Sequence, residues 1–526
     1  MLATCGPGPR TSDCPAGQRC LRAGNLADPG SLDPAHAFVK MDQTVIDDLL
    51  VGLTTFDAAG EPIPGMATDW TTSADGLTWT FHLRAALWSD GEPVTAGDFV
   101  YSLRRLVDPK TGAGYANLAF PVANARAINA GKAPLQSLGI SAPDARTVVI
   151  RLAHPTPYLP ALLAHYGVVP VPEHVVRRWG DTWTAPGHYV SNGPFMLKAW
   201  RLGDTITLEK NPRFYDASHV CLDRIDYLPI SDGVSAERQV KRGELDLNAS
   251  FNSNRLDYLR GKAGMGAYVR VHPWTDLVYV VFNQDYPPFR DARVRQALAM
   301  SIDREFIADK LLRGGPKPAY AFTPPGMGAL PAGPDWQGPT FAARQARARA
   351  LLAAAGYGPG HPLSFELKHF SVLGGVAPAL QSDWREVGVD VRLASADIAV
   401  FFSELQAGAF QAGFTDWIAD YPDATNFLNL MRGDDPGANY GHYADRTYDA
   451  LLRQAEAEPR ESVRARLLQA AERRMLQAAP IAPVYVNPSH NLVNPGVTGW
   501  VDNLNDVHPK RWLCRARPAP PRPSRA

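Results

Sequence analysis

The segment from 291 to 486 alternates helical and extended patterns, and this alternation constrains the fold more than any other sequence feature. Asp291 is expected to cap a helix that runs to about Leu312, and Gly356 to end a helix over 340–355 as a left-handed cap. Further strands are predicted over 363–367, 389–393 and 481–486, and further helices over 376–387, 447–457 and 460–478. Such alternation is typical of an α/β lobe with a layered sheet.

The first part of the chain carries shorter strands, more turns and one clear helix. Residues 77–83 alternate with period two, which predicts a strand with one buried face. Thr95 is expected to cap a helix, because Phe99, Leu103 and Leu106 follow at helical spacing. Additional strands are predicted over 146–152 and 205–208. With 526 residues, and about 150 per domain, three or four domains are expected.

Charge and composition exclude several classes of protein. The 53 basic and 53 acidic side chains cancel, which argues against a nucleic-acid coat or a polybasic membrane binder. Hydrophobic residues make up 45% of the chain, enough to bury a large core. The longest uncharged stretch, 152–172, contains five prolines that forbid a continuous membrane-spanning helix. It is predicted to be buried strand and loop.

No catalytic or metal-binding motif is present in the sequence. The five cysteines form no CxxC pair, and their scarcity fits either a reducing compartment or a large periplasmic protein. GxSxG, HExxH, P-loop and GxGxxG patterns are missing, and the 13 histidines are scattered. Asp434 and Asp435 could form a glycosidase pair, but the flanking Gly433 and Pro436 indicate a solvated loop. We therefore expect no enzyme, no cofactor and no metal.

Three segments carry the functional information. They are WTFHLR at 79–84 with WSDGEPVTAGDFVYS at 88–102; Asn283 with PFRDARVRQAL at 288–298 and IDR at 302–304; and WIADYPDATNFL at 417–428. SLDP at 31–34, SNGP at 191–194, YLPI at 227–230, TPP at 323–325 and PVY at 483–485 accompany them. In this order, from about Leu21 to Leu513, the motifs resemble extracellular solute-binding protein family 5, the peptide-binding proteins of ABC importers, in its oligopeptide-binding branch.

The resemblance implies an α/β fold of the two-lobed periplasmic-binding-protein kind, type II-like, with an extra third domain. Two crossover strands, near 274–279 and 485–492, would form the hinge. The expected parts are a discontinuous lobe I (15–62, 190–274 and 491–516), an extra domain (63–189) and lobe II (275–490), with residues 1–14 and 517–526 disordered.

The resemblance also implies a function. The protein would capture oligopeptides in an interlobe cleft and deliver them to the membrane permease and its ATPase, as a monomer in the periplasm without a nucleic-acid partner. Alternatives are a receptor for cell-wall (murein) or modified peptides, and a peptide-sensing or chaperone-like binder without transport. LATC at 2–5 resembles the end of a lipoprotein signal, so a lipid anchor is an alternative, although no charged and apolar leader precedes it in the given sequence.

The same resemblance nominates binding residues. Asp420 matches an aspartate that pairs with the ligand's free α-ammonium, and the backbone of Asp416 and Ile418 would run beside the ligand as an added strand. The other expected contacts are Trp417, Tyr115, Trp274, Tyr279, Tyr485 and Asn283. An ordinary loop acid is the alternative for Asp420, and core packing is the alternative for the aromatic residues.

Departures from the family pattern bear on the ligand. A disulfide of a well-known member would join the positions of Asp276 and Ile418, so that bridge is missing here. At a cleft position where the family pattern has an acidic residue, this chain has Phe38, with Lys40 nearby. The same member has basic residues that receive the peptide carboxylate. The matching positions in this chain are Gly375, Leu405, Phe414 and Leu312, and none of them is basic. We therefore expect the ammonium anchor to be kept and the carboxylate anchors to be lost.

Overall fold

A computed structural model describes residues 14–328, 332–433 and 439–515. The chain divides into two compact units. Unit 1 comprises the residues up to Asn252, Tyr258–Arg270 and the residues from His490 onward; unit 2 comprises Ser253–Asp257 and Val271–Ser489. Two long strands, β12 (Val269–Phe282) and β17 (Ile481–Val493), carry the chain from one unit to the other. The division of unit 1 into a lobe and an extra domain stays a prediction. Of the termini expected to be disordered, all but Cys14 lie outside the described residues.

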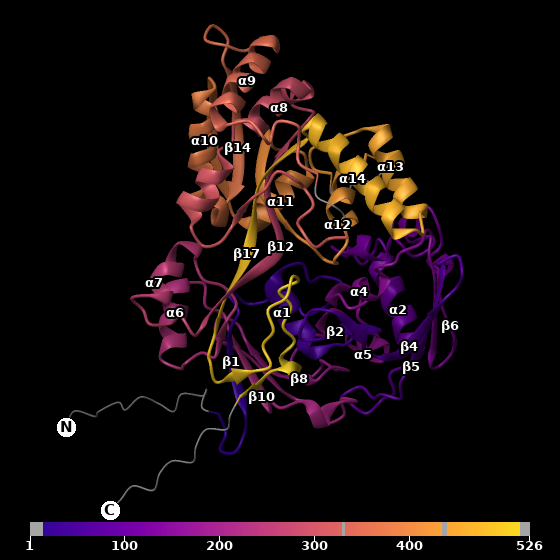
Figure 1. Cartoon of the computed structure of the whole chain (residues 1–526). Coiled ribbons are helices and arrows are strands. Elements are labelled where there is room, and N and C mark those ends of the chain that lie inside the picture. Colours follow the sequence, from indigo (N-terminus) through magenta and orange to yellow (C-terminus); the bar gives the residue numbers. More distant parts are fainter. Residues whose placement is uncertain (1–13, 329–331, 434–438, 516–526) are drawn as a thin grey trace, which may run out of the picture. The chain divides into compact units, whose positions relative to one another are not determined.

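Unit 2 is built on a mixed sheet with helices around it (Figure 1), as the alternating sequence pattern predicts. Its strand order is β15 (Val389–Ala396), β14 (Leu363–Phe370), β16 (Ala412–Ile418), β12 and β17, with β13 (Lys317–Pro318) on β17. β14 is parallel to β15 and β16, whereas β12 and β16 are antiparallel. The helices are α8 (Ala292–Met300), α9 (Phe341–Ala354), α10 (Ala377–Glu386), α11 (Ile398–Gln406), α12 (Thr425–Leu428), α13 (Arg446–Ala457) and α14 (Glu461–Ala478). The α/β class is confirmed.

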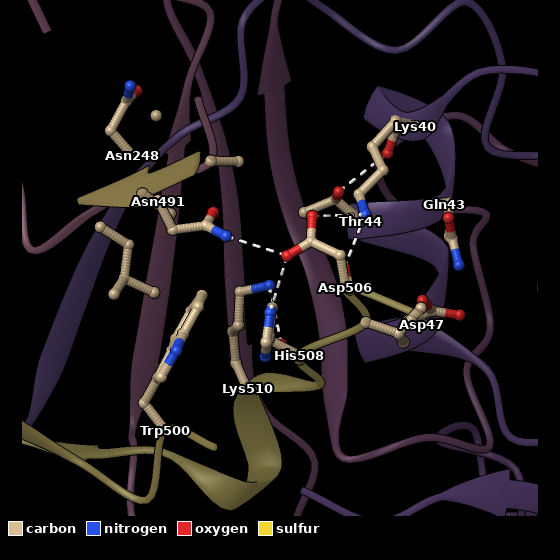
Figure 2. A pocket seen from close by; sticks show the side chains of 15 residues that line it. Lys40, Gln43, Thr44, Asp47, Asn248, Asn491, Trp500, Asp506, His508 and Lys510 are labelled. Carbon is tan, nitrogen blue, oxygen red and sulfur yellow. Dashed lines mark hydrogen bonds and ion pairs between the residues drawn. The ribbon is translucent and has the colours of Figure 1, made fainter. Parts of the chain in front are cut away.

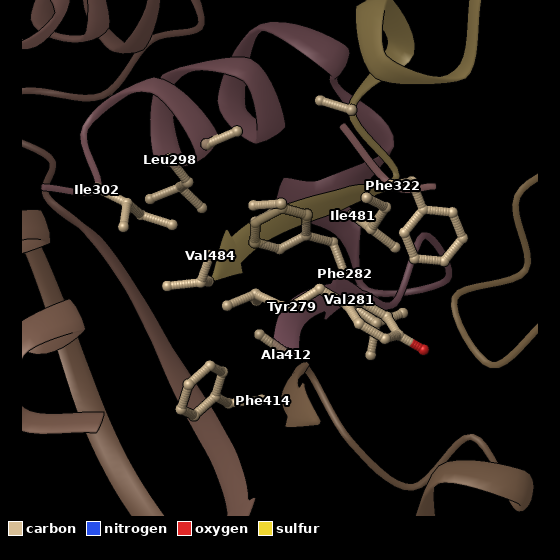
Figure 3. Close-up of a cluster of buried hydrophobic side chains, with 14 of the residues drawn as sticks. Tyr279, Val281, Phe282, Leu298, Ile302, Phe322, Ala412, Phe414, Ile481 and Val484 are labelled. Carbon is tan, nitrogen blue, oxygen red and sulfur yellow. The ribbon is translucent and has the colours of Figure 1, made fainter. Parts of the chain in front are cut away.

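The core of unit 2 surrounds the central strand β12 (Figure 3). Residues 277–282 of β12, LVYVVF, are all buried, so apolar side chains cover both faces of this strand. Leu298 of α8 and Ile302, which follows this helix, belong to this core, and so do Ile481 and Val484 of β17. This burial fixes β12 and its neighbour β16 as a rigid support for the residues at their ends.

Unit 1 contains two larger sheets. The first has the order β11 (Leu247–Asn248), β1 (Cys20–Gly24), β10 (Arg224–Leu228), β9 (Thr205–Lys210) and β8 (Phe195–Arg201), and the end of β17 pairs with β11. The second has the order β4 (Ala67–Thr72), β5 (Thr78–Leu83), β7 (Thr147–Arg151) and β6 (Ile140–Asp144). Short pairs join β2 (Thr54–Phe56) to β3 (Pro62–Pro64) and β18 (Val497–Thr498) to β19 (Cys514–Arg515).

The helices of unit 1 include the one that Thr95 was expected to cap. They are α1 (Lys40–Leu49), α2 (Ala96–Val107), α3 (Ala125–Asn129), α4 (Leu159–Leu162), α5 (Glu173–Trp179), α6 (Gly233–Lys241) and α7 (Leu256–Arg260), the last of which begins in unit 2. At α2 the backbone N–H of Thr95 donates to Asp98 Oδ2 at 2.8 Å, which completes a capping box. This prediction is confirmed.

Two predictions about local structure are wrong. The helix that begins after Asp291 ends at Met300, and 306–312 form a separate π-helical segment. The break arises at Asp303, whose side chain accepts a hydrogen bond from the N–H of Phe306 and so starts a new segment. The proline-rich stretch 152–172 folds into α4 and short turns, not strand. Within the described residues, no helix has the length and apolar character needed to cross a bilayer.

Two disulfides lie in unit 1, and the sequence did not predict them. One joins Cys14 to Cys20 and the other joins Cys221 to Cys514. Cys5 lies outside the described residues. The second bridge connects residues that are 293 positions apart, so it ties the C-terminal segment to the body of unit 1.

Candidate functional site

Among the residues that the structure describes, strand β16 is paired on only one edge along its last four residues. β14 pairs with β16 as far as His369 opposite Phe414, and then ends at Phe370. β12 pairs with the other edge of β16 up to Asp276 opposite Ile418. No strand of the described segments pairs with the β14-side edge of 415–418. An unoccupied sheet edge of this kind can accept an extended peptide as an added strand.

The loop after β16 holds Asp420 through the side chain of Asn426 at the start of α12. Asn426 Oδ1 accepts a hydrogen bond from Trp417 Nε1 at 2.7 Å and a longer one from the N–H of Asp420 at 3.3 Å. Asn426 Nδ2 lies 3.4 Å from Asp420 Oδ2. Because Asn426 is buried, it links two predicted ligand contacts, Trp417 and Asp420, in one fixed arrangement.

An ion pair beneath the same loop fixes its path. Arg464 of α14 donates from its two terminal nitrogens to the two carboxylate oxygens of Asp423, at 2.6 and 2.8 Å. Asp423 Oδ1 also accepts hydrogen bonds from the backbone N–H of Thr425 at 3.0 Å and from its hydroxyl at 2.6 Å. Both charged side chains are about nine-tenths buried, with 10% and 8% exposure. Such a bidentate pair gives the Asp420 loop a defined geometry.

Two further carboxylates lie on the sheet beside this loop. Asp276 of β12 is opposite Ile418, and Asp416 of β16 is opposite Val278, so both side chains are on the same face of the strand pair. Asn487 Nδ2 donates to Asp276 Oδ2 at 2.9 Å. Asp416 keeps part of its surface exposed, yet burial raises its pKa to about 6. Burial, and then the charges of Asp276 and Asp416, raise the pKa of the Tyr485 phenol.

The aromatic residues predicted on β12 and β17 have different surroundings. Trp274 is half-buried on β12. Tyr279 is 1% exposed and belongs to the unit 2 core, where its ring meets Phe322 edge-on at 5.2 Å. Tyr485 is also buried in this core. The structure thus gives Tyr279 and Tyr485 the packing role that was the alternative to ligand contact, and any ligand contact by them stays a prediction.

Asn283 does not fit the predicted binding set. It follows the end of β12, and a strand rises about 3.3 Å per residue, so it lies roughly 23 Å from the Asp276 position. Its Nδ2 donates to the carbonyls of Gly408 and Phe410, at 3.2 and 2.8 Å, and its Oδ1 accepts from the N–H of Asp285. These bonds use both ends of the amide to form a turn. These bonds give Asn283 a structural role, and its contact with a ligand stays a prediction.

Tyr115 belongs to unit 1 and lies in an aromatic cluster. Its ring centroid is 5.1 Å from that of Phe38 and 5.3 Å from that of His165. Tyr166 meets the Tyr115 ring edge-on at 5.8 Å. Phe38 is 39% exposed, so one side of this cluster faces solvent. Contact between Tyr115 and a ligand stays a prediction.

The four positions expected to match basic residues of a well-known family member have no cation here. Leu405 and Phe414 are fully buried in the core of unit 2. Gly375 is exposed and Leu312 is partly buried. Two of these positions therefore belong to the hydrophobic core of unit 2.

Unit 1 also contains a small cavity, lined by polar and apolar side chains (Figure 2). Asp506 Oδ1 accepts a hydrogen bond there from Asn491 Nδ2 at 2.9 Å and lies 3.0 Å from His508 Nε2, and Asp506 Oδ2 accepts from Lys40 Nζ at 3.0 Å. Burial, followed by the charge of Asp48, raises the pKa of the adjacent Asp47 to about 7. The cavity measures about 40 Å³, which is room for a few water molecules. It is too small for a peptide.

Several positioning residues were not predicted from the sequence. Asn426 and Asp423 stand within the third motif, but nothing local distinguishes them from other polar loop residues. Arg464 is 41 residues beyond its partner Asp423, and Asn487 is 211 residues beyond Asp276. Only the folded chain shows these pairings.

Comparison with known proteins establishes the class to which this fold and site belong. The family model described as "Bacterial extracellular solute-binding proteins, family 5 Middle" matches residues 61–439. The chain therefore belongs to the family 5 extracellular solute-binding proteins, whose members are binding proteins and not enzymes. The family resemblance noted from the sequence is confirmed.

Individual relatives match nearly the whole chain. The periplasmic oligopeptide-binding protein OppA of Salmonella typhimurium is 36% identical over 514 residues, covering 95% of this chain and 94% of the relative. The probable deoxycholate-binding periplasmic protein YgiS of Escherichia coli is 37% identical over 494 residues, covering 92% and 91%. Among solved structures, the murein tripeptide binding protein MppA of Escherichia coli superposes with a TM-score of 0.89 at 35% identity, covering 95% of this chain and 99% of that one.

Proposed function

We propose that this protein is the substrate-binding receptor of an ABC importer, which captures peptides and delivers them to a membrane permease and its ATPase. Family membership and the oligopeptide-binding relatives support this proposal. The peptide would bind in extended form along the open edge of β16, with its α-ammonium at Asp420. Closure of two lobes over the ligand is what the family fold implies.

The observation that carries the proposal is the conjunction of an unpaired strand edge with an anchored carboxylate. Residues 415–418 offer backbone N–H and C=O groups on their free edge, and Asp420 follows two residues later. Backbone bonding does not depend on the ligand's side chains, so it tolerates many sequences. A carboxylate at the end of that edge selects a free amino terminus, because a dehydrated ammonium needs a counter-charge.

We place the mature protein in the periplasm. The disulfides Cys14–Cys20 and Cys221–Cys514 support an oxidising compartment. The relatives OppA of Salmonella typhimurium and MppA of Escherichia coli are named as periplasmic proteins. A lipid anchor at Cys5 is the variant form of this proposal. Fractionation of native cells, with and without detergent, distinguishes a periplasmic protein from a lipid-anchored one. Recovery only in the cytosol would contradict both the periplasmic and the anchored form of the proposal.

A cell-wall or modified peptide is the second candidate ligand. The similarity to MppA, which is named as binding murein tripeptide, favours it. So does the lack of a cation at Gly375, Leu405, Phe414 and Leu312, because an ordinary free carboxylate would have no partner there. Native mass spectrometry of protein purified from its own host distinguishes linear peptides from cell-wall fragments by the mass of the bound ligand.

Binding by an Asp420→Ala variant tests the proposal. Loss of one partner of a buried charge pair costs about 3–5 kcal/mol, so peptide affinity should fall by roughly two to three and a half decades. Asp390→Ala is the matched control, because Asp390 is an exposed carboxylate on β15 of the same unit. Calorimetry should show normal affinity for the control. Equal affinities for all three proteins would contradict the proposed anchor.

A further inference from the structure

Asp416 presents a second carboxylate to the proposed peptide edge. It lies within the open segment 415–418, four residues before Asp420. Its side chain shares a face of the β12–β16 pair with Asp276, because Asp276 is opposite Ile418 and Asp416 is opposite Val278. Diagonal neighbours of this kind have Cα atoms about 7–8 Å apart, so one cationic group could lie between the two carboxylates.

No positively charged side chain within the described segments forms an ion pair with Asp416. The charge of Asp416 acts on the phenols of Tyr279 and Tyr485, and neither of these groups is a cation. Burial without a counter-charge raises the pKa of Asp416 to about 6. A recessed carboxylate that lacks a partner costs folding free energy, and a bound cation would offset that cost.

We propose that Asp416, with Asp276 beside it, makes this receptor select peptides that carry a second positive charge near their N-terminus. The inference rests on the proposed function, since it takes Asp420 as the anchor of the first charge. Asn487 Nδ2 donates a hydrogen bond to Asp276 Oδ2 at 2.9 Å and so holds this carboxylate in place.

Strand geometry limits where the second charge lies in the ligand. A strand advances about 3.3 Å per residue, so the four positions from Asp416 to Asp420 span at most about 13 Å. A lysine side chain adds several ångströms of reach from its own backbone position. The basic residue is therefore expected among the first three residues of the peptide. Its preferred position identifies the ligand side chain that points to the Asp416 face.

Calorimetry with matched tetrapeptides tests this inference. The probes are tetra-alanine and its analogues with lysine, or the uncharged isostere norleucine, at position one, two or three. For the wild type, at least one lysine peptide should bind ten or more times as tightly as its norleucine counterpart. In Asp416→Asn this preference should disappear while affinity for tetra-alanine is kept. The asparagine is isosteric and removes an uncompensated charge, so the melting temperature should not fall.

The outcomes separate this inference from the proposed function. Asp390→Asn, at an exposed position of the same unit, should retain the lysine preference. If wild type binds tetra-alanine in an Asp420-dependent way but never prefers lysine, or if Asp416→Asn keeps the preference, the inference is wrong and the proposed function stands. If no tetrapeptide binds the wild type, peptide capture itself fails and this inference fails with it.

Discussion

The guanidinium of Arg464 and the carboxylate of Asp423 form a bidentate ion pair, with N–O distances of 2.6 and 2.8 Å, beneath the loop that carries Asp420. The two residues come from α14 and from the segment before α12, so the pair joins the Asp420 loop to a helix of unit 2. It therefore constrains the position of the proposed ammonium anchor.

Arg464→Met should therefore weaken both folding and binding. The substitution leaves Asp423 buried without its counter-charge, which costs about 3–5 kcal/mol in the free energy of unfolding. Arg177→Ala is a suitable control, because Arg177 is 70% exposed and its pair with Glu173 contributes less than about 1 kcal/mol. Urea denaturation measures the stability and calorimetry measures peptide affinity. Similar losses of stability for the two variants would show that the Asp423 pair does not support the loop.

Asn426→Leu should reduce peptide affinity and stability by similar free energies. It removes one strong hydrogen bond to Trp417 and two long contacts to Asp420, each bond being worth about 1 kcal/mol. We expect an affinity loss of about tenfold and a stability loss of about 1–2 kcal/mol. Trp417 fluorescence should also change in the free protein, because its indole N–H loses its partner. Unaltered affinity would mean that Asp420 keeps its position without Asn426.

How much of this architecture could be predicted depended on whether the signal was local. Thr95 and Asp98 stand three residues apart, and the alternation around β5 is continuous, so these elements were foreseen. The family motifs placed Asp276 and Ile418 at matching positions, and the strand register sets them opposite each other. The prediction of a helix as far as Leu312 was wrong because the side chain of Asp303 accepts a hydrogen bond from the N–H of Phe306. Hydrophobic periodicity does not reveal such a bond.

Long-range pairings account for what could not be predicted. Cys221 and Cys514 are 293 residues apart, and nothing in a count of five cysteines selects that pair. Asn283 was predicted to contact a ligand because it belongs to a family motif. In the structure it lies in the turn that follows β12, seven residues beyond Asp276. Tyr279 lies on a strand that is buried on both faces. Its position in the sequence therefore could not show whether its side chain packs in the core or contacts a ligand.

Glu472 should make unit 2 less stable as pH rises. It is fully buried in α14, where Oε1 accepts from the N–H groups of Phe322 and Thr323, and burial raises its pKa from 4.5 to about 7. The folded state therefore binds more protons than the unfolded state between these values, so stability is lost as pH rises through that window. Glu472→Gln mimics the protonated form.

The stability difference between Glu472→Gln and wild type should shift in favour of the variant by about 2–3 kcal/mol from pH 5 to pH 8. Urea titrations at several pH values measure it, and comparison with wild type cancels the contributions of the other titrating groups. A difference that does not vary with pH would show that Glu472 titrates normally in the folded protein.

The two disulfides should differ in their contribution to stability. In the loop-entropy account, a bridge across 293 residues stabilises by roughly 5–6 kcal/mol and one across 6 residues by about 2 kcal/mol. Paired serine substitutions at Cys221 and Cys514 should therefore lower the melting temperature more than those at Cys14 and Cys20. Reduction of the wild type should approach the sum of both effects. The opposite ranking would contradict the assigned pairing or the entropic account.

The most direct test of the central claim, that Asp420 holds a free peptide ammonium, is calorimetry on one peptide in three forms: free, N-acetylated and C-amidated. Acetylation removes the charge that Asp420 would bind, so it should lower affinity by roughly two decades or more. Amidation should cost much less, because Gly375, Leu405, Phe414 and Leu312 provide no cation for the carboxylate. Equal affinity for the free and acetylated forms would contradict the account, since a receptor that reads the ammonium through Asp420 must detect its loss.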